Sequence, residues 1–436
     1  MDAQFRWPAI ALLALVVSPA TFAQEARDAA PPLSLQAALD EALERNPTLV
    51  ALRRVYDTAR ERPAQARFLK PPMLEAQIWQ FPVNTLNPAK ANMYMFMVGQ
   101  ELPGRGKRAL RQSLLQTDAE LAEADIAVRA RAVVDEVKRA YAEVFLARAS
   151  IDIYRDNLEL LRQFADISHA KYETGRISQQ DVLKAVVELS RLHEEIIGVE
   201  ERARLAEAEL NTLLDRPPGA RIGALAGPRE RVALPEASLL QARAVDAQPE
   251  LRVARLAIAQ AEAALAVEQS EYKPDFFVQG GYMVMPDMTD AWMARAGITW
   301  PKAPWSRGAL DAKVAEAKAA VAERRAELRA AESAVRLAVQ QAYVRVQAAQ
   351  ARADLIKTSL VPQSTQVLDV SRAAYQTDRV DFLALIDNQR VLLAVRLDYH
   401  RALADLEQAT ADLERAVGVD HDTGAAAART IHGDLR

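Results

Sequence analysis

The stretch "YETGRISQQDVL" at residues 172–183 recurs as "YQTDRVDFLALI" at residues 375–386. In both copies a helical pattern reaches a tight turn, "ETGRIS" or "QTDRVD", and a second helical pattern follows the turn. Gly175 can supply the left-handed backbone that ends a helix, and Asp378 tolerates the same conformation less well. The two stretches therefore predict two antiparallel helical hairpins.

The helices on either side of these turns are long. The first hairpin is predicted to join helices 106–173 and 179–214, and the second to join helices 306–374 and 382–417. At ~1.5 Å per residue, the first of these helices would have a length on the order of 100 Å. Pro362 is expected to kink or loosen the third helix. Helices of this length belong to a rod, a hairpin or a tube rather than to a compact globule.

An apolar stripe runs along the long helices. Positions spaced alternately by four and three residues from Val133 to Tyr172 are apolar, with the single exception of Ser168. The same register 202 residues later is apolar except at Gln363. A seven-residue repeat that continues this far indicates left-handed supercoiling against neighbouring helices.

The chain contains an internal duplication with a separation of about 202 residues. The recurring pairs include Lys70 with Lys273, Gly106 with Gly308, and Tyr141 with Tyr343. Two tandem copies of one unit, at residues 24–218 and 219–418, are the natural interpretation.

Each unit also contains two segments with the period-two alternation of β-strands. They lie at residues 73–83 and 92–102 in the first unit, and at 275–285 and 291–300 in the second. Strands of this length can cross a bilayer when they tilt. Four strands cannot close a barrel, and the smallest closed barrels have about 8 strands, so several chains must contribute.

The ends and the composition of the chain limit its location and partners. Residues 1–23 carry Arg6, an apolar run and small residues before Gln24, which is the pattern of a cleavable secretory signal. No later stretch offers ~20 consecutive apolar residues, so any membrane crossing is expected to use strands. The chain has no cysteine, which excludes thiolate metal sites, and its net charge of −4 indicates no nucleic-acid partner. Residues 419–436 are predicted to be a disordered tail.

The motif search predicts neither an enzyme nor a bound cofactor. The five histidines are scattered, and no P-loop, dinucleotide fingerprint, nucleophile elbow or HExxH motif is present. One set of residues suggests a metal site, because thioethers favour Cu(I) or Ag(I), although Met also fills irregular apolar packing. Its members are Met93, Met95, Met97, Met283 and Met285. Of the two interpretations, packing in an apolar wall is preferred.

The order of these features resembles the TolC-type outer-membrane efflux family, and in particular its heavy-metal cation branch. The likeness covers residues 33–418 and is carried by "LSLQAALDEALERNPTL", "QELPGRGKRA", "ITWPKAPWSRGALDAKVAEAKA", two "Y-x-T-x-R" turns and the duplication. The resemblance implies a mainly α fold with a small β part. Long coiled-coil hairpins would form a trimeric α-barrel, and each chain would give four strands to a shared twelve-stranded transmembrane β-barrel. It also implies a homotrimer in outer-membrane lipid, with a periplasmic tunnel docked on an adaptor protein and an inner-membrane RND pump.

Three sets of candidate site residues follow. The resemblance implies adaptor docking at the hairpin tips, at Gly175, Arg176, Ile177, Ser178, Asp378, Arg379, Val380 and Asp381. It implies a periplasmic gate at Tyr172, Asp181, Tyr375 and Asp387. The strand-to-helix transition is placed at Gly104, Gly106, Lys107 and Gly308, with the cations near the polar edge of the membrane. Ordinary turn chemistry and helix capping would explain the tip residues equally well.

The leading functional hypothesis is the outer-membrane channel of a tripartite RND-type exporter, acting as a passive exit duct for heavy-metal cations. A multidrug or type I secretion channel is the first alternative. A soluble periplasmic coiled-coil adaptor or scaffold is the second.

Overall fold

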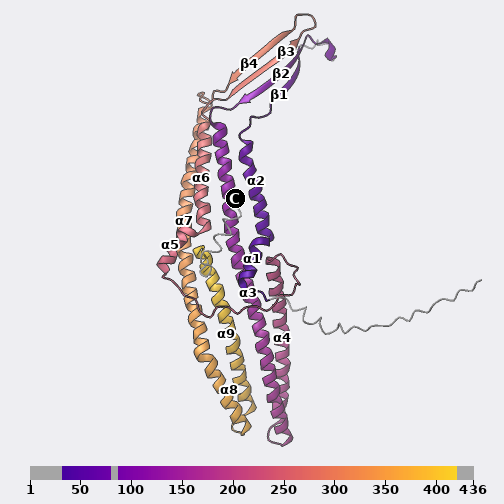
Figure 1. The fold of residues 1–436 in the computed structure, drawn as a ribbon, viewed down its shortest axis with the longest axis vertical. Helices are drawn as coiled ribbons and strands as arrows, with labels where there is room; N and C mark the ends of the chain where they lie inside the picture. The colour runs from indigo at the N-terminus through magenta and orange to yellow at the C-terminus, as the bar shows by residue number, and fades with distance from the viewer. Residues whose placement is uncertain (1–31, 80–86, 420–436) are drawn as a thin grey trace, which may run out of the picture.

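The computed structural model describes residues 32–79 and 87–419. In Figure 1 a rod of helices stands upright, and a four-stranded sheet crosses its upper end. The predicted signal segment 1–23, almost all of the predicted tail and the last residues of predicted strand 73–83 lie outside the described residues.

The two halves of the chain repeat one order of elements, as the duplication predicts. The first copy consists of α1 (Leu35–Arg45), α2 (Pro47–Gln65), β1 (Met73–Trp79), β2 (Met93–Leu102), α3 (Lys107–Glu173) and α4 (Gln179–Leu213). The second consists of α5 (Ala237–Ala247), α6 (Pro249–Ser270), β3 (Phe276–Val284), β4 (Ala291–Ile298), α7 (Arg307–Leu355), the π-helical segment η3 (Ile356–Leu360), α8 (Val361–Gln376) and α9 (Phe382–Val417). A short 3-10 turn, η2 (Pro88–Lys90), precedes β2.

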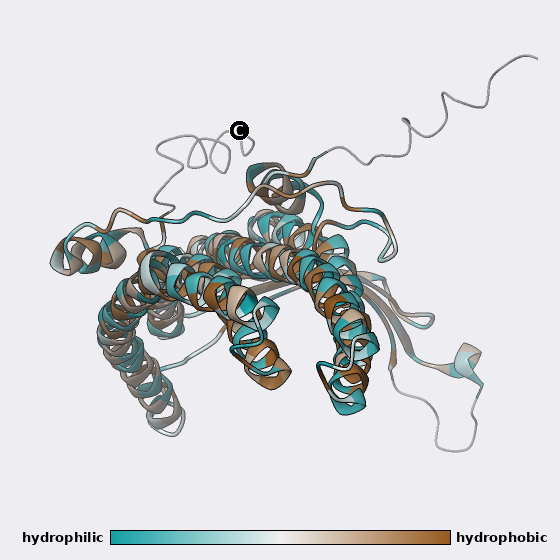
Figure 2. Cartoon of the chain, turned by 90° about the horizontal axis from the view of Figure 1, so that it is seen from below, coloured by the Kyte–Doolittle hydropathy of each residue, from teal (hydrophilic) through white to brown (hydrophobic). Residues whose placement is uncertain are grey.

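The middle of the rod has the same core in both copies. In the first copy Val133, Val137 and Val144 of α3 are buried against α1 and α4. In the second copy Val339 and Val346 of α7 are buried against α5 and α9. These residues belong to the predicted heptad stripe, so the stripe is confirmed in this region. Seen from below, the long helices lie side by side in a curved layer (Figure 2).

Pro362 lies just after the π-helical segment η3, where the helix changes from α to π. Val361 N–H donates to Ile356 C=O, five residues back, in place of the usual four. The wider turn lies where the proline ring would otherwise clash with the carbonyl of Thr358. A π turn holds one more residue than an α turn, and this residue accounts for a change in repeat offset, from 202 at Tyr343 to 203 at Tyr375.

The heptad register predicted beyond η3 is wrong for the same reason. The predicted stripe positions Leu360, Val367 and Val370 are exposed, whereas Leu368 and Tyr375 are buried. The extra residue rotates the following helix, so the core face moves one position along the sequence.

A buried ionic cluster joins the two copies between α3 and α9. Lys138 and Glu414 form a buried ion pair, and Arg415 Nη1 lies 3.1 Å from Asp135 Oδ2. Arg139 also pairs with Asp412 across the same contact. Removing one partner of a buried pair typically costs about 3–5 kcal/mol, so this cluster fixes how the copies dock.

The sheet draws on both copies. Its order is β1-β2-β3-β4, and all three pairings are antiparallel, with β2 of the first copy beside β3 of the second. Among the described strands, nothing pairs with the outer edge of β1 or of β4. The sheet therefore ends in two open edges.

Within residues 32–79 and 87–419, the helices include none that combines the length and apolar character needed to cross a membrane.

Candidate functional site

The strand register sorts the sheet residues onto two faces of different chemistry. On the first face Leu74 pairs with Val98, Phe96 with Tyr282, and Tyr282 with Trp292. The large exposed apolar residues on this face are Leu74, Ile78, Phe96, Val98, Phe276, Val278, Trp292 and Ile298. A continuous exposed apolar band on one side of strands is the pattern of a lipid-facing wall. We call this side the apolar face.

Aromatic side chains lie at both ends of the apolar face. Tyr282 and Trp292 stack edge to face, with ring centroids 5.0 Å apart, toward the end of the sheet that is distant from the rod. Trp300 and Trp305 form a second edge-to-face pair, with centroids 5.9 Å apart, at the rod end. Tyr and Trp are enriched where a membrane-spanning wall meets the two interfaces.

The opposite face mixes polar residues with methionine. Glu75 pairs with Met97 between β1 and β2, and Gln279 pairs with Arg295 between β3 and β4. Gln279 Nε2 donates to Glu75 Oε2 at 3.3 Å. The polar side of such a wall faces the lumen, so we call it the lumenal face.

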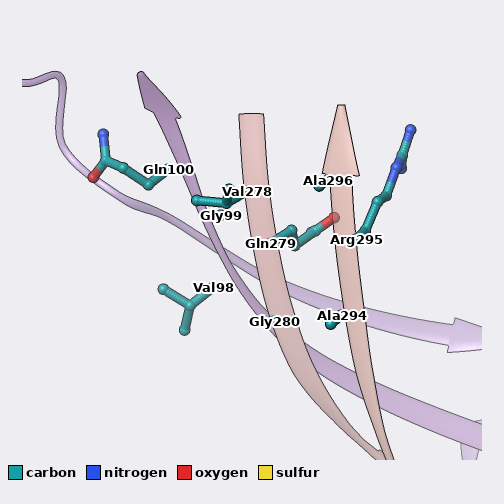
Figure 3. A pocket seen from close by; sticks show the side chains of 9 residues that line it. All are labelled: Val98, Gly99, Gln100, Val278, Gln279, Gly280, Ala294, Arg295 and Ala296. Carbon is teal, nitrogen blue, oxygen red and sulfur yellow. The ribbon is translucent and has the colours of Figure 1, made fainter. Parts of the chain in front are cut away.

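A hollow of ≈ 620 Å³ lies at the middle of β2, β3 and β4. Figure 3 shows Gln279 and Arg295 on neighbouring strands beside it, with Arg295 extending away from β4. The hollow is shaped by residues with little or no side chain, including Gly280, Ala294 and Ala296.

Lys107 lies at the junction between the sheet and the rod. Its side chain is only 1% exposed, and its Nζ lies 2.8 Å from Glu271 Oε2 and 3.0 Å from Asp275 Oδ2. Arg111 also pairs with Glu271, at 3.0 Å, and the Gly104 N–H donates to Asp275 Oδ1 at 2.7 Å. The junction thus ties α3 to the chain between α6 and β3. The two carboxylates draw Lys107 into the protein, and its place near the polar edge of the membrane stays a prediction.

Asp275 is held ionised by this arrangement. Burial on its own raises the pKa of the carboxyl group. The hydrogen bonds from the Gly104 N–H and from Lys107 outweigh burial, so the pKa of Asp275 lies below its ordinary value.

Two of the three predicted transition glycines have geometry that requires glycine. A Cβ on Gly104 would lie 2.5 Å from the carbonyl oxygen of Pro274, and Gly106 has a φ of +90°. Gly308 lies at the equivalent place, in the first turn of α7, but a Cβ there would meet no atom within 4 Å. The junction therefore needs glycine in the first copy and only tolerates it in the second.

The two hairpin tips lie at the end of the rod farthest from the sheet (Figure 1). Of the eight predicted docking residues, six are exposed, and Ile177 and Val380 are half-buried. Gly175 and Asp378 have left-handed φ values of +68° and +59°. The Asp381 side chain caps α9 by accepting from Ala384 N–H at 3.0 Å.

One residue that the sequence reasoning missed, Lys171, holds the two tips together. Its buried ammonium group donates to Tyr375 C=O and to the Asp378 carboxylate, and it lies 4.3 Å from the centre of the Tyr375 ring. Ser168 Oγ and Tyr375 OH are 3.0 Å apart in the same contact. Arg176 Nη1 approaches Asp378 Oδ2 at 3.5 Å. We call these five residues the tip link.

The heptad register explains why Lys171 was missed. A strict 3.5-residue repeat places Tyr172 on the buried stripe, but Tyr172 is 42% exposed and Lys171 is buried. At Phe164 and Lys171 the buried face lies one position before the predicted stripe residues Ala165 and Tyr172.

The four predicted gate residues do not form one cluster. Tyr375 lies in the tip link, whereas its repeat equivalent Tyr172 is exposed. Asp181 Oδ2 accepts from Ser178 Oγ at 3.2 Å, and Asp387 pairs with Arg390 of its own helix at 3.6 Å.

A rod of long hairpins, a sheet with one apolar face and a buried ionic junction between them together define an outer-membrane efflux channel subunit. The comparisons agree with this class. The model of the family described as outer membrane efflux protein matches residues 38–216 and 240–419, one stretch in each half of the chain. The chain belongs to this family, whose members are channels, and is located in the outer membrane.

Individual proteins and solved structures are also similar to this chain. The chain is 24% identical over 394 residues to the cobalt-zinc-cadmium resistance protein CzcC of Cupriavidus metallidurans, and the match covers 90% of this chain and 91% of the relative. The solved structure of CusC matches with a TM-score of 0.73 at 16% identity, covering 88% of this chain and 92% of that one. The outer membrane protein VceC of Vibrio cholerae matches with a TM-score of 0.72 at 18% identity, covering 89% and 97%.

Among the described residues, no group of three or more His, Cys, Asp or Glu side chains is arranged to hold a metal ion.

The junction makes a first prediction. Replacing Lys107 with Met leaves two partly exposed carboxylates without their shared buried cation, so we expect a loss of about 1–3 kcal/mol in stability. Thermal unfolding of the detergent-solubilised protein measures the loss. Lys70→Met is the matched control, because Lys70 forms a 2.9 Å pair with Glu101 in which both side chains are more than half exposed. The control should lose no more than ~1 kcal/mol. Equal losses in the two variants would contradict the role of the junction.

The tip link makes a second prediction. The Lys171 ammonium group holds the pKa of Asp378 below its ordinary value of 3.8. The stabilisation is therefore complete above the ordinary pKa, and it is lost as the pH falls through the lower pKa of the folded state. Asp378→Asn keeps a residue that tolerates left-handed backbone but removes the charge.

Spin labels at Thr174→Cys and Thr377→Cys, in a chain that has no other cysteine, report the distance between the tips. We expect a narrow distance distribution at pH 7 that broadens as the pH falls below 3.8, and a broad one for Asp378→Asn at either pH. Asp387→Asn is the control and should behave as the parent chain. A narrow distribution in Asp378→Asn at pH 7 would show that the tip link does not hold the hairpins.

Proposed function

We propose that three copies of this chain form one continuous duct, from the outer membrane into the periplasm, and that heavy-metal cations leave the cell through it. The observation that carries the proposal is the sheet, with its apolar face and two open edges. Open edges expose unpaired backbone N–H and C=O groups, which are not tolerated in lipid. Pairing β4 of one protomer with β1 of the next protomer leaves no open edge once the ring of three protomers closes.

The helices support the same assembly. On α4 the exposed apolar residues Val186 and Ile197 are eleven residues apart and share a helix face. On α7 the residues Leu337, Val344 and Leu355 have spacings of seven and eleven and also share a face. In Figure 1 α4 and α7 lie on opposite sides of the rod. Two different surfaces that fit each other form a head-to-tail contact, which closes into a ring when the rotation permits.

The hairpin tips are the proposed entrance and docking site. They are the most distant part of the rod from the sheet, and most of their residues are exposed and polar. We propose that the periplasmic adaptor of an exporter with an RND pump contacts them. We propose that the tip link keeps the entrance closed within one protomer. Of the four predicted gate residues, only Tyr375 belongs to this link.

The cargo proposal comes from the relative CzcC, whose name states cobalt, zinc and cadmium resistance. A passive duct needs no catalytic group, and none is proposed. Multidrug export and type I secretion use the same architecture in the family resemblance, so they are the alternatives that the experiment must distinguish.

The third prediction tests the cargo and the tips together. A strain that lacks this chain should become at least fourfold more sensitive to one or more of the Cu, Ag, Zn, Co and Cd salts, with unchanged sensitivity to a dye panel. Arg176→Glu with Arg379→Glu should reproduce this loss while membrane levels stay normal, because reversed charge at the tips opposes docking. Arg401→Glu is the control, since Arg401 lies on α9 away from the tips and pairs with Asp398 of its own helix.

Sensitivity to dyes alone would overturn the cargo proposal. Full resistance in the tip variant would overturn the docking proposal. Recovery of the parent chain as a soluble periplasmic monomer would overturn the duct itself.

A further inference from the structure

The methionines of this chain are confined to the strands and their loops. Apart from Met1, the eight methionines are Met73, Met93, Met95, Met97, Met283, Met285, Met288 and Met293, and the long helices contain none. Methionine is a good helix former and is not among the residues enriched in strands. A side chain used only to fill gaps would also occur in the large helical cores. The distribution therefore indicates that methionine has a role specific to the sheet.

The strand register places six methionines on the lumenal face, and four of them lie beside one another across β2, β3 and β4. Met95 of β2 is directly opposite Met283 of β3. Met97 is opposite Gly281, and Gly281 is in turn opposite Met293 of β4. Directly opposite residues have Cβ atoms about 4.5–5.5 Å apart, and diagonal neighbours remain within reach of long side chains. We call Met95, Met97, Met283 and Met293 the methionine ladder.

Gly281 creates the space that brings the ladder together. A Cβ at this position would lie 2.7 Å from Met97 Cγ, so the Met97 side chain occupies the place where a side chain would otherwise stand. The Met97 side chain thereby lies over Gly281, whose other neighbour in the register is Met293. Any larger residue at 281 would push Met97 away from β3.

Two methionines of the ladder are buried, and uncharged or acidic residues lie opposite them on β1. Met95 and Met97 are 7% and 6% exposed, and Met283 and Met293 are half-buried. On β1 the residues opposite Met97 and Met95 are Glu75 and Gln77. Arg295, the cation of this face, is two residues beyond Met293 and pairs with Gln279 in the register.

We propose that the methionine ladder binds a soft monovalent metal cation, Cu(I) or Ag(I), on the lumenal face. Thioether sulfur is a soft donor that selects such cations, whereas Zn and Co prefer imidazole, carboxylate or thiolate ligands. A thioether needs no deprotonation before it binds, so the affinity stays constant over a pH range in which His or carboxylate sites lose theirs. The placement on the transport path rests on the proposed duct, but binding by the ladder does not.

The absence of cysteine makes a direct test possible. The purified full-length protein in detergent is loaded with silver nitrate in chloride-free buffer, and silver X-ray absorption identifies the atoms bound to the metal. Because the chain has no cysteine, sulfur neighbours can come only from methionine. We expect two or more sulfur neighbours and at least one tightly held silver ion per chain. A shell of only nitrogen or oxygen neighbours would overturn the proposal, and this measurement needs no variant.

Variants then assign the sulfur atoms. The variant M95L/M97L/M283L/M293L removes the thioethers with little change in volume, and it should weaken silver binding at least tenfold in equilibrium dialysis. The control M73L/M288L changes two methionines outside the ladder and should bind as the parent chain does. Zinc, as a borderline cation, should bind equally to all three proteins.

Unchanged silver binding by the four-leucine variant would show that the ladder is packing only. This result is separate from the resistance assay. A ladder that binds silver in a strain with normal metal resistance would contradict the proposed cargo and leave the site in place. Loss of metal resistance in the deletion strain, without any silver–sulfur contact in the protein, would contradict the methionine site and leave the proposed cargo in place.

Discussion

The outer edges of β1 and β4 set the condition that the rest of the molecule must meet. No described strand pairs with either edge, and the sheet between them has an exposed apolar face. Such a sheet is not stable in lipid as a single copy, because each unpaired backbone group there costs several kcal/mol. The exposed apolar stripes of α4 and α7 run along the rod below the same two sides. The proposed head-to-tail contact between protomers would satisfy both the sheet and the helices.

The two repeats of the chain share one architecture, and small differences between them give each repeat its own role. The first copy has the glycine-dependent junction at Gly104 and Gly106, and the second supplies its partner Asp275. The π turn at η3 keeps the second hairpin in register despite one extra residue and Pro362. At the tips the copies meet again, where Lys171 of the first holds Asp378 of the second. Both ends of the rod thus depend on contacts between the two repeats of the chain.

The sequence predicted the elements well, because their signals are local. Long runs without Pro or Gly, repeated turns and period-two alternation predicted the described ends of the long helices and strands to within about two residues, and the heptad stripe predicted the core at Val133 and Val339. It failed where a residue's role depends on long-range packing. The partners of Lys107, Glu271 and Asp275, lie 164 and 168 residues later in the chain, and Lys171 lies one position outside the predicted stripe. Helix register beyond η3 depended on a single π turn, which composition does not reveal. The docking tips remain predictions, because their partner is another protein.

Ring closure between edges is most directly tested by cysteine crosslinking in this naturally cysteine-free chain. Ala76 on β1 and Ala294 or Ala296 on β4 share the apolar face, and within one chain the two edge strands are separated by two intervening strands. Adjacent strands are ~4.8 Å apart, so a disulfide within one chain, which needs Cα atoms within about 7 Å, cannot form. With Ala76→Cys and a cysteine on β4, oxidation in membranes should give covalent dimers and trimers, and either cysteine alone should give neither. Monomers in every pairing along the two edges would contradict the shared wall.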